Sequence, residues 1–450
     1  MNQNIRQTHL KSKKKILIHV DHRRRDIYPS ILLSLYLKNY GYKCILGSRV
    51  NSKYLYYKHR PDLVLLTQPN CIFNANELKN ESKNTIFVLM HPESSEMNPE
   101  MMINMMRGGE KEVGNRYTKY ISKVFTWGPI LKNVIVNEGL FEDEQVEIVG
   151  NFRYDFYLNK KKSIGNEIGA MSSFTGISNF DNRAMFSNID NGRNLHGYYY
   201  DIKGGYEDYL WMSSAFLRIY YEFMDVWCLE NKNKISLRPY TLESLADYSY
   251  FRKKYGEFID IDSKTPFFDW INGLEANVFC YSSSIIESVV SNTPFITIQG
   301  IIEERLEFHF PKKSFPAIRG EIYEYTHKPK SIDELIDLLN LAKNNKLKLK
   351  TDIHRSKNLS TLLWDYYGWP QKKPSSEIIA QEIHNLIGSH SINKEIKFKK
   401  LMKEFAIYPL RSIKHMHSMG LKSFNDYNYI FLKNNENLIA KTQFQNITNK

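Results

Sequence analysis

The sequence has 450 residues, enough for two domains of ordinary size and a further segment. Its 42% hydrophobic and 25% charged residues are typical of a globular protein and argue against a disordered or fibrous chain. No stretch of about 18 apolar residues occurs, so we expect no membrane-spanning helix. The N-terminus also lacks the apolar segment of a signal peptide, and we expect a cytoplasmic protein.

The formal net charge of +13 favours an anionic partner, such as a nucleotide or the anionic face of a membrane. No nucleic-acid-binding module is recognisable, so we do not expect a nucleic-acid partner. The four cysteines are far apart and have no metal-ligand spacing. They are typical of reduced thiols in a cytoplasm, and the sequence predicts no metal site.

The first third of the chain alternates apolar runs with helical patterns. The run KILIHV at 15–20 reads as a buried strand, and a helical pattern follows up to a stop at Gly41. Further apolar runs lie at 44–48, 61–68, 84–91, 123–128 and 146–150. Strands that are nearly all apolar and alternate with helices predict a parallel, doubly wound sheet in residues 1–157.

The second part repeats this alternation after a polar stretch rich in Asn, Ser and Gly. The apolar island IGAMSSFTG at 168–176 reads as its first strand, a long helix at 207–231 follows, and KISLRP at 234–239 is the next strand. We therefore expect a second Rossmann-like domain at 158–390. Residues 391–450 form a basic, partly amphipathic tail, which is either a peripheral membrane or partner helix or an ordinary surface helix.

Three serines follow a strand of the second domain, in the stretch ANVFCYSSSIIESVVSNTPFITIQG at 276–300. Ser284 and Glu287 have the spacing of a capping box, which is a purely structural role. Ser282 and Ser283 are not needed for that cap. A hydroxyl-rich strand end followed by a helix can also bind phosphate, so we expect a ligand at these serines.

Arg238 ends another strand of the same domain, where it is suited to pair with a phosphate or a sugar carboxylate. The nearby DID at 260–262 has the form of a metal-binding DxD motif. A match of three residues arises easily by chance, and we do not assign a metal to it.

Charged residues also follow strands of the first domain. Asp21, Arg24 and Arg25 lie after the first strand, where no GxGxxG fingerprint occurs, and could receive an anionic substrate. His91 and Glu93 follow another strand and are candidates for a general base.

The last strand of the first domain leads into GNFRYD at 150–155. Gly150 permits a tight exit from the strand. Arg153 and Asp155 would then face the region between the domains. Either this segment is a hinge, or it forms a wall of the binding cleft that includes Asp155.

Taken together, these segments resemble the bacterial surface carbohydrate biosynthesis proteins of GT-B glycosyltransferase architecture, which are similar to Kdo transferases and CDP-glycerol glycerophosphotransferases. The resemblance covers residues 14–390 and is most specific at WGP…GNFRYD and SSSIIESVVSNTPFI. It implies two Rossmann-like domains that face a cleft. Many relatives read Arg-Pro-His-Pro where this chain has LRPY, so Tyr240 replaces a histidine there.

The resemblance implies a metal-independent transferase that moves a sugar, such as Kdo from a CMP donor, onto a surface polysaccharide or lipopolysaccharide. The alternatives are a CDP-glycerol-type polyol-phosphate transferase and a nucleotide-sugar 2-epimerase of the same fold. The implied donor site holds Arg238, Ser282, Ser283, Ser284 and Glu287.

The implied acceptor site is in the first domain and holds Asp21, Arg24, Arg25 and Arg153. The catalytic candidates are His91 and Glu93 as bases, and Glu93 and Asp155 as nucleophiles. No cofactor is implied beyond the nucleotide-activated substrate. The tail would touch the inner face of the cytoplasmic membrane.

Overall fold

The computed structural model describes most of the two expected domains and little of the tail. The described residues are 14–21, 23–90, 103–104, 106–107, 117–158, 167–174, 177–178, 205–240, 243, 245–280, 282–306, 322–350, 358–389, 400–404 and 406–407, and the side chains of 23–24, 205–212 and 306 are not described.

The first unit is a parallel sheet of six strands in the order β2-β1-β3-β4-β5-β6. Its strands are β1 (Lys15–Val20), β2 (Lys43–Ser48), β3 (Leu63–Leu66), β4 (Ile86–Met90), β5 (Lys123–Thr126) and β6 (Val146–Ile148). Strands β3 and β4 are buried along their whole length. Such burial is expected when helices cover both faces of a parallel sheet.

Helices and short 3-10 turns connect these strands. They are α1 (Arg23–Asn39), α2 (Ser52–His59), α3 (Ala75–Glu81), η2 (Thr118–Tyr120), α5 (Pro129–Asn137), η3 (Asp143–Gln145) and η4 (Phe152–Tyr157). Helix α1 begins at Arg23, so Arg25 and Asp26 lie in its first turn and not in the loop that the sequence predicts.

The second unit is a parallel sheet of five strands in the order β11-β10-β7-β8-β9. Its strands are β7 (Glu167–Met171), β8 (Ile235–Arg238), β9 (Ile259–Ile261), β10 (Leu274–Phe279) and β11 (Phe295–Thr297). The predicted first strand in the island at 168–176 is confirmed as β7, which lies at the centre of the sheet.

The helices of the second unit flank this sheet. They are α7 (Gly205–Met224), the π-helical turn η5 (Asp225–Glu230), α8 (Ser249–Tyr255), η6 (Gly256–Phe258), α9 (Phe267–Asn272), α10 (Ile285–Val290), α11 (Gln299–Leu306) and α13 (Ile332–Lys343). A buried apolar cluster joins α7, α13 and the inner strands.

Both sheets are doubly wound, as the sequence predicts, and each has one point where the strand order reverses. In the first sheet this switch point lies between β1 and β3, and in the second between β7 and β10. Ligands of open α/β sheets bind outside the carboxyl ends of the strands at such a point. The topology alone therefore marks two candidate binding edges.

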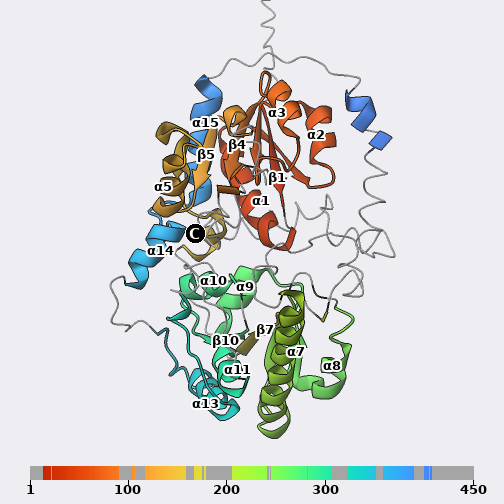
Figure 1. The fold of residues 1–450 in the computed structure, drawn as a ribbon, viewed down its shortest axis with the longest axis vertical. Helices are drawn as coiled ribbons and strands as arrows, with labels where there is room; N and C mark the ends of the chain where they lie inside the picture. The colour runs from red at the N-terminus through yellow and green to blue at the C-terminus, as the bar shows by residue number, and fades with distance from the viewer. Residues whose placement is uncertain are drawn as a thin grey trace, which may run out of the picture.

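The two edges face each other. Figure 1 shows the second unit below the first, with α9 and α10 on the side nearest the first unit. The ring of Phe268 in α9 stacks on Phe156 of η4, with centroids 4.2 Å apart, and meets the edge of Tyr28 in α1 at 5.7 Å. Aromatic contacts of this kind add stability beyond the apolar area that they bury.

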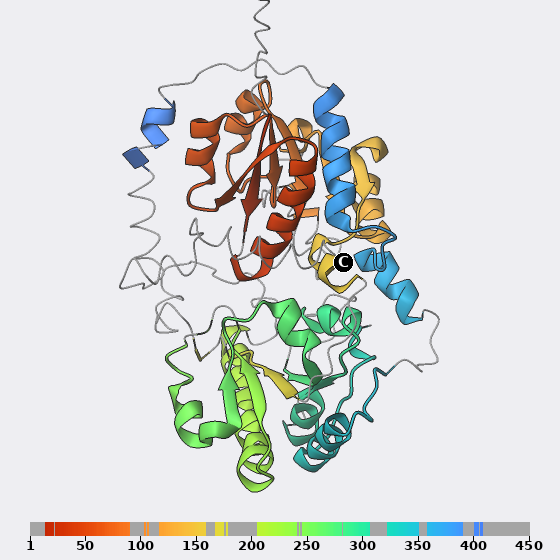
Figure 2. The same ribbon diagram turned by 180° about the vertical axis from the view of Figure 1, so that it is seen from behind.

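Two later helices return to the first unit, although the sequence assigns them to the second domain. Helix α14 (Leu359–Tyr367) packs on α5, and α15 (Ser375–Ser389) packs along α1. Figure 2 shows α15, in blue, beside the first unit. The buried face of α15 is apolar, with Ile379 and Ile383 in the core of the first unit, so burial of that face explains the return.

The chain after β6 approaches the start of α15 closely. Gly150 has a φ of +78°, which confirms the predicted tight turn, and a side chain there would clash with Gln371 and Ser375. Asp155, which lies in η4 after this turn, accepts hydrogen bonds from the backbone N–H groups of Ser375 at 2.6 Å and Ser376 at 2.8 Å. It therefore caps the first turn of α15.

A described segment of the tail docks on the first unit. Lys400 Nζ lies 2.7 Å from Oε1 of Glu81, whose side chain is only 1% exposed. The hydroxyls of Tyr56 and Tyr57 donate to the same carboxylate. Within the described ranges, no helix is long and apolar enough to cross a membrane.

The cap on α15 can be tested by Asp155→Asn, which replaces one acceptor oxygen by an NH₂ group that faces a backbone N–H. We expect the free energy of unfolding to fall by about 1–3 kcal/mol, because a buried donor is left unsatisfied. Urea denaturation measures this loss. The control is Asp337→Asn on the exposed face of α13, which should change stability little, and equal effects of the two variants would contradict the cap.

Candidate functional site at the facing edges

The three serines lie at the exit of β10, on one side of the switch point in the second sheet. The predicted capping box is not formed: Ser284 precedes α10 but its side chain makes no capping hydrogen bond. Instead the Ser284 N–H donates to Oγ of Ser282 at 3.2 Å. Among the hydrogen bonds of the described residues, none involves the hydroxyl of Ser283 or Ser284. Both hydroxyls are therefore available to a ligand.

Helix α10 itself offers less to a phosphate than the sequence predicts. It has six residues, and the N–H groups of Ile285 and Ile286 already lie 3.3 and 3.2 Å from the carbonyl oxygens of Ser282 and Ser283. Since these first amides are engaged, the serine hydroxyls are the better donors at this edge.

Arg238 ends β8 and is held within the second unit. Its Nη2 donates to the carbonyl of Thr265 at 2.7 Å, and its guanidinium lies 5.3 Å from the ring centre of Trp270. Nη1 is 3.7 Å from Asp262, the second aspartate of the DID motif. Asp262 also accepts the backbone N–H groups of Lys264 and Thr265, so it acts as a turn residue that orients Arg238.

Glu287 points away from α10 toward the first unit. It forms an ion pair with Arg153, which lies in η4 after β6, and the two side chains are 5% and 11% exposed. Burial lowers the pKa of Arg153, but Glu287, together with Tyr154 and Asp26, raises it, and the net shift is upward. The second oxygen, Oε2 of Glu287, is buried, and no described residue forms a hydrogen bond with it. The structure thus brings together two predicted residues, one from each domain.

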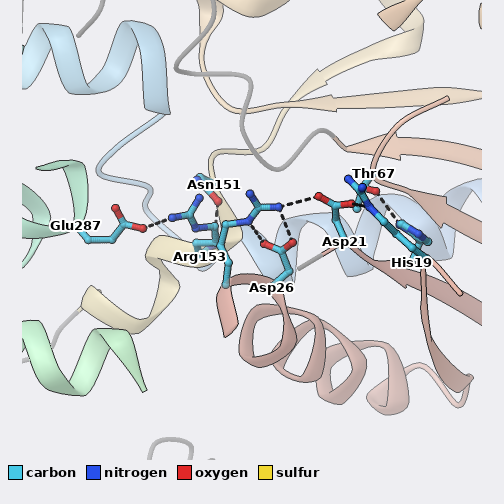
Figure 3. Close-up of polar contacts among 9 residues, drawn as sticks. His19, Asp21, Asp26, Thr67, Asn151, Arg153 and Glu287 are labelled. Carbon is cyan, nitrogen blue, oxygen red and sulfur yellow. Dashed lines mark hydrogen bonds and ion pairs between the residues drawn. The ribbon is translucent and has the colours of Figure 1, made fainter. Parts of the chain in front are cut away.

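A chain of charges continues from Arg153 along the edge of the first sheet, as Figure 3 shows. Arg25 donates to both oxygens of Asp26, at 2.6 and 2.8 Å, and to Asp21 at 3.1 Å. Asp21 also pairs with Arg49, which follows β2. Burial raises the pKa of Asp21, but Arg49 and Arg25 hold it below its ordinary value.

His19, which the sequence analysis did not single out, lies near this chain at the first switch point. It is 2% exposed, and its Nδ1 is 2.7 Å from Oγ1 of Thr67, just after β3. The thiol of Cys71 interacts with the imidazole by charge and by a side-chain hydrogen bond. Burial lowers the pKa of His19, whereas Cys71 and Asp21 raise it, and the net shift is upward. In the sequence, only its position near the end of the first apolar run indicates that it could lie at a binding edge.

The remaining predicted residues either lie outside the described structure or are engaged by another helix. His91 and Glu93 lie outside the described residues, as does the side chain of Arg24. Both oxygens of Asp155 are engaged by the start of α15, so its predicted role as a nucleophile stays a prediction. Burial raises the pKa of Asp155 to about 7, although the hydrogen bonds from Ser376 and Ser375 lower it. No group of three or more metal-ligating side chains occurs in the part of the chain that the structure describes.

The arrangement of two facing Rossmann-like units is that of the GT-B fold. No family model and no curated protein matches the sequence. Among solved structures, the chain is similar to the UDP-GlcNAc 2-epimerase from Methanocaldococcus jannaschii, with 13% identity and a TM-score of 0.46 over 82% of this chain and 99% of that one.

Two further similarities are with structures whose names refer to a nucleotide or to a polymer. S. aureus MnaA in a co-structure with UDP is 12% identical with a TM-score of 0.45, over 85% of this chain and 100% of that one. The wall teichoic acid polymerase TagF is 12% identical with a TM-score of 0.49, over 83% and 90%. Likeness at this level does not decide the chemistry of the site.

The ion pair between the units can be tested by Arg153→Met, which leaves the buried Glu287 without its counter-charge. We expect a loss of about 3–5 kcal/mol, because an uncompensated buried charge is costly. The double variant Arg153→Met/Glu287→Leu should recover most of this loss. Denaturant unfolding measures both, and additive losses in the double variant would show that the two side chains are not coupled.

Proposed function

We propose that the protein is a glycosyltransferase that binds a nucleotide-activated sugar at the carboxyl edge of its second sheet and an acceptor at the edge of its first sheet. The observation that supports this most is the pairing of two switch points across one seam. One has unengaged serine hydroxyls at the exit of β10, and the other has a row of charged residues after β1 and β2.

The donor side suits a phosphate because it offers serine hydroxyls and an arginine at the strand exits on either side of β7. Ser283 and Ser284 offer hydroxyl donors, and Arg238 places a positive charge at the end of β8. Fixed donors of this kind stabilise a departing nucleotide phosphate, so the proposed reaction does not depend on a metal ion. Glu287 has a buried oxygen that is not hydrogen-bonded within the described structure, and a sugar or ribose hydroxyl would satisfy it.

The acceptor side combines arginines with carboxylates that neutralise them. Arg25, Arg49 and Arg153 each pair with an acidic side chain in the described structure. A glycan acceptor, which is neutral or weakly anionic, fits such a balanced surface better than an excess of positive charge would. We propose His91 and Glu93 as proton acceptors, with His19 as a third candidate because it lies at the first switch point.

We also propose a class of sugar and nucleotide for the donor. A CMP-linked acidic sugar such as Kdo would place its own carboxylate within reach of Arg238. The acceptor is then a growing surface polysaccharide or lipopolysaccharide. The site of action is the cytoplasm, at the inner face of the membrane if the basic tail binds anionic lipid.

Thermal unfolding with CMP, CDP, UDP and GDP tests the donor site, because a ligand bound to the native state raises the melting temperature. A shift with CMP alone would favour an acidic sugar, and a shift with CDP would favour a polyol-phosphate donor. No shift with any of the four would contradict the proposal.

The position of the site is tested by Ser283→Ala/Ser284→Ala. We expect nucleotide affinity to fall roughly tenfold or more, because hydrogen bonds to a charged phosphate are lost. The matched control is Ser291→Ala at the other end of α10, whose hydroxyl donates to the Ser288 carbonyl at 2.9 Å. It should unfold more easily yet bind nucleotide like the wild type.

A further inference from the structure

Glu243 is a buried carboxylate at the edge of the second sheet that the proposed chemistry does not use. It follows β8 and is 2% exposed. Four donors converge on it: the backbone N–H groups of Phe174 and Tyr240, and the hydroxyls of Ser172 and Tyr248. The N–H of Tyr240 is 2.8 Å away.

None of the ion pairs within the described residues includes Glu243, so hydrogen bonds alone compensate its burial. Burial raises the pKa of Glu243, and the bonds from Ser172, Tyr248, Phe174 and Tyr240 lower it, with a net upward shift. An ionised carboxylate accepts only, whereas an amide or a protonated acid also donates. A carboxylate therefore matches four donors at this point better than an amide, although the Tyr240 N–H and the Tyr248 hydroxyl also reach Oγ of Ser172 at 3.0 and 2.6 Å.

The four donors come from three different segments. Ser172 and Phe174 belong to the exit of β7, Tyr240 to the exit of β8, and Tyr248 directly precedes α8. Ser172 is tied to β8 a second time, because its N–H donates to the carbonyl of Arg238 at 3.2 Å. One side chain thus fixes the relative position of two strand exits.

The exit of β7 is also tied to β10, on the other side of the switch point. The hydroxyl of Tyr220 in α7 donates to the carbonyl of Met171 and lies 3.4 Å from that of Val278. The position of the β7 exit therefore bears on the geometry of the whole edge, from Arg238 to the serines after β10.

We propose that Glu243 is a positioning residue for nucleotide binding: it holds the exits of β7 and β8 in the conformation that the ligand requires, without touching the ligand. This inference rests on the proposed function. The ligand class is a nucleoside mono- or diphosphate at the β7/β10 switch point. Loss of the carboxylate lets the two exits separate, and binding weakens even where the fold survives.

The test is calorimetric titration of CMP, CDP and UDP into Glu243→Gln, compared with Glu275→Gln. Glu275 is the matched control, because it is also buried in the second unit but lies at the amino end of β10, far along the strand from the exits. We expect the dissociation constant of Glu243→Gln to rise at least tenfold. Glu275→Gln should bind like the wild type, even if its melting temperature is lower.

The outcomes separate the two proposals. If the wild type binds none of these nucleotides, the proposed function fails and this inference fails with it. If the wild type binds and a folded Glu243→Gln binds equally well, the positioning role alone is overturned. If Glu243→Gln does not fold, Tyr248→Phe is the second variant, because it removes one of the four donors to Glu243. We expect its nucleotide affinity to fall about threefold. Unchanged affinity would overturn the positioning role of Glu243.

Discussion

The buried ion pair between Arg153 and Glu287 determines how the two units of this protein meet. It joins the exit of β6 in the first sheet to α10 in the second, and both side chains are almost fully buried. A buried pair of this kind adds little net stability against an apolar contact, but either partner alone is strongly unfavourable. The pair therefore favours one relative orientation of the units, and the stack of Phe156 on Phe268 is one of the apolar contacts that accompany it.

Buried carboxylates serve as connectors throughout the molecule. Asp155 joins η4 to α15, Glu81 joins α2 to Lys400, and Glu243 joins the exits of β7 and β8. In each case one acidic side chain receives donors from segments that are distant in the sequence. Each of these connections lies within one unit, whereas a buried apolar cluster that includes Tyr154 and Ile285 runs from the first unit into the second.

The sequence predicted the parts of the fold that depend on local patterns. The apolar runs at 15–20 and 168–176 became β1 and β7 because nearly continuous apolar strands are buried on both faces. The pairing of the strands and the two switch points required the structure. Ser282, Ser283 and Ser284 were correctly placed at a strand exit, because a polar cluster after an apolar run marks that point.

Contacts between distant residues explain what the sequence did not predict. Ser284 and Glu287 have the spacing of a capping box, but Arg153, 134 residues earlier, offers Glu287 a full charge in place of a backbone amide. Asp155 was predicted to line a cleft because nothing in its neighbourhood indicates the start of α15, 220 residues later. The sequence does not predict the role of Glu243, because its donors Phe174 and Tyr240 come together only when β7 and β8 pair.

The central claim is that a nucleotide binds at the switch point of the second sheet. A crystal structure of the protein with whichever of CMP, CDP, UDP or GDP it binds most tightly tests this directly. We predict electron density for the phosphate within hydrogen-bonding distance of the Ser283 and Ser284 hydroxyls, between the exits of β7 and β10. Density for the nucleotide at the β1/β3 edge of the first sheet, with the serines unoccupied, would contradict the account.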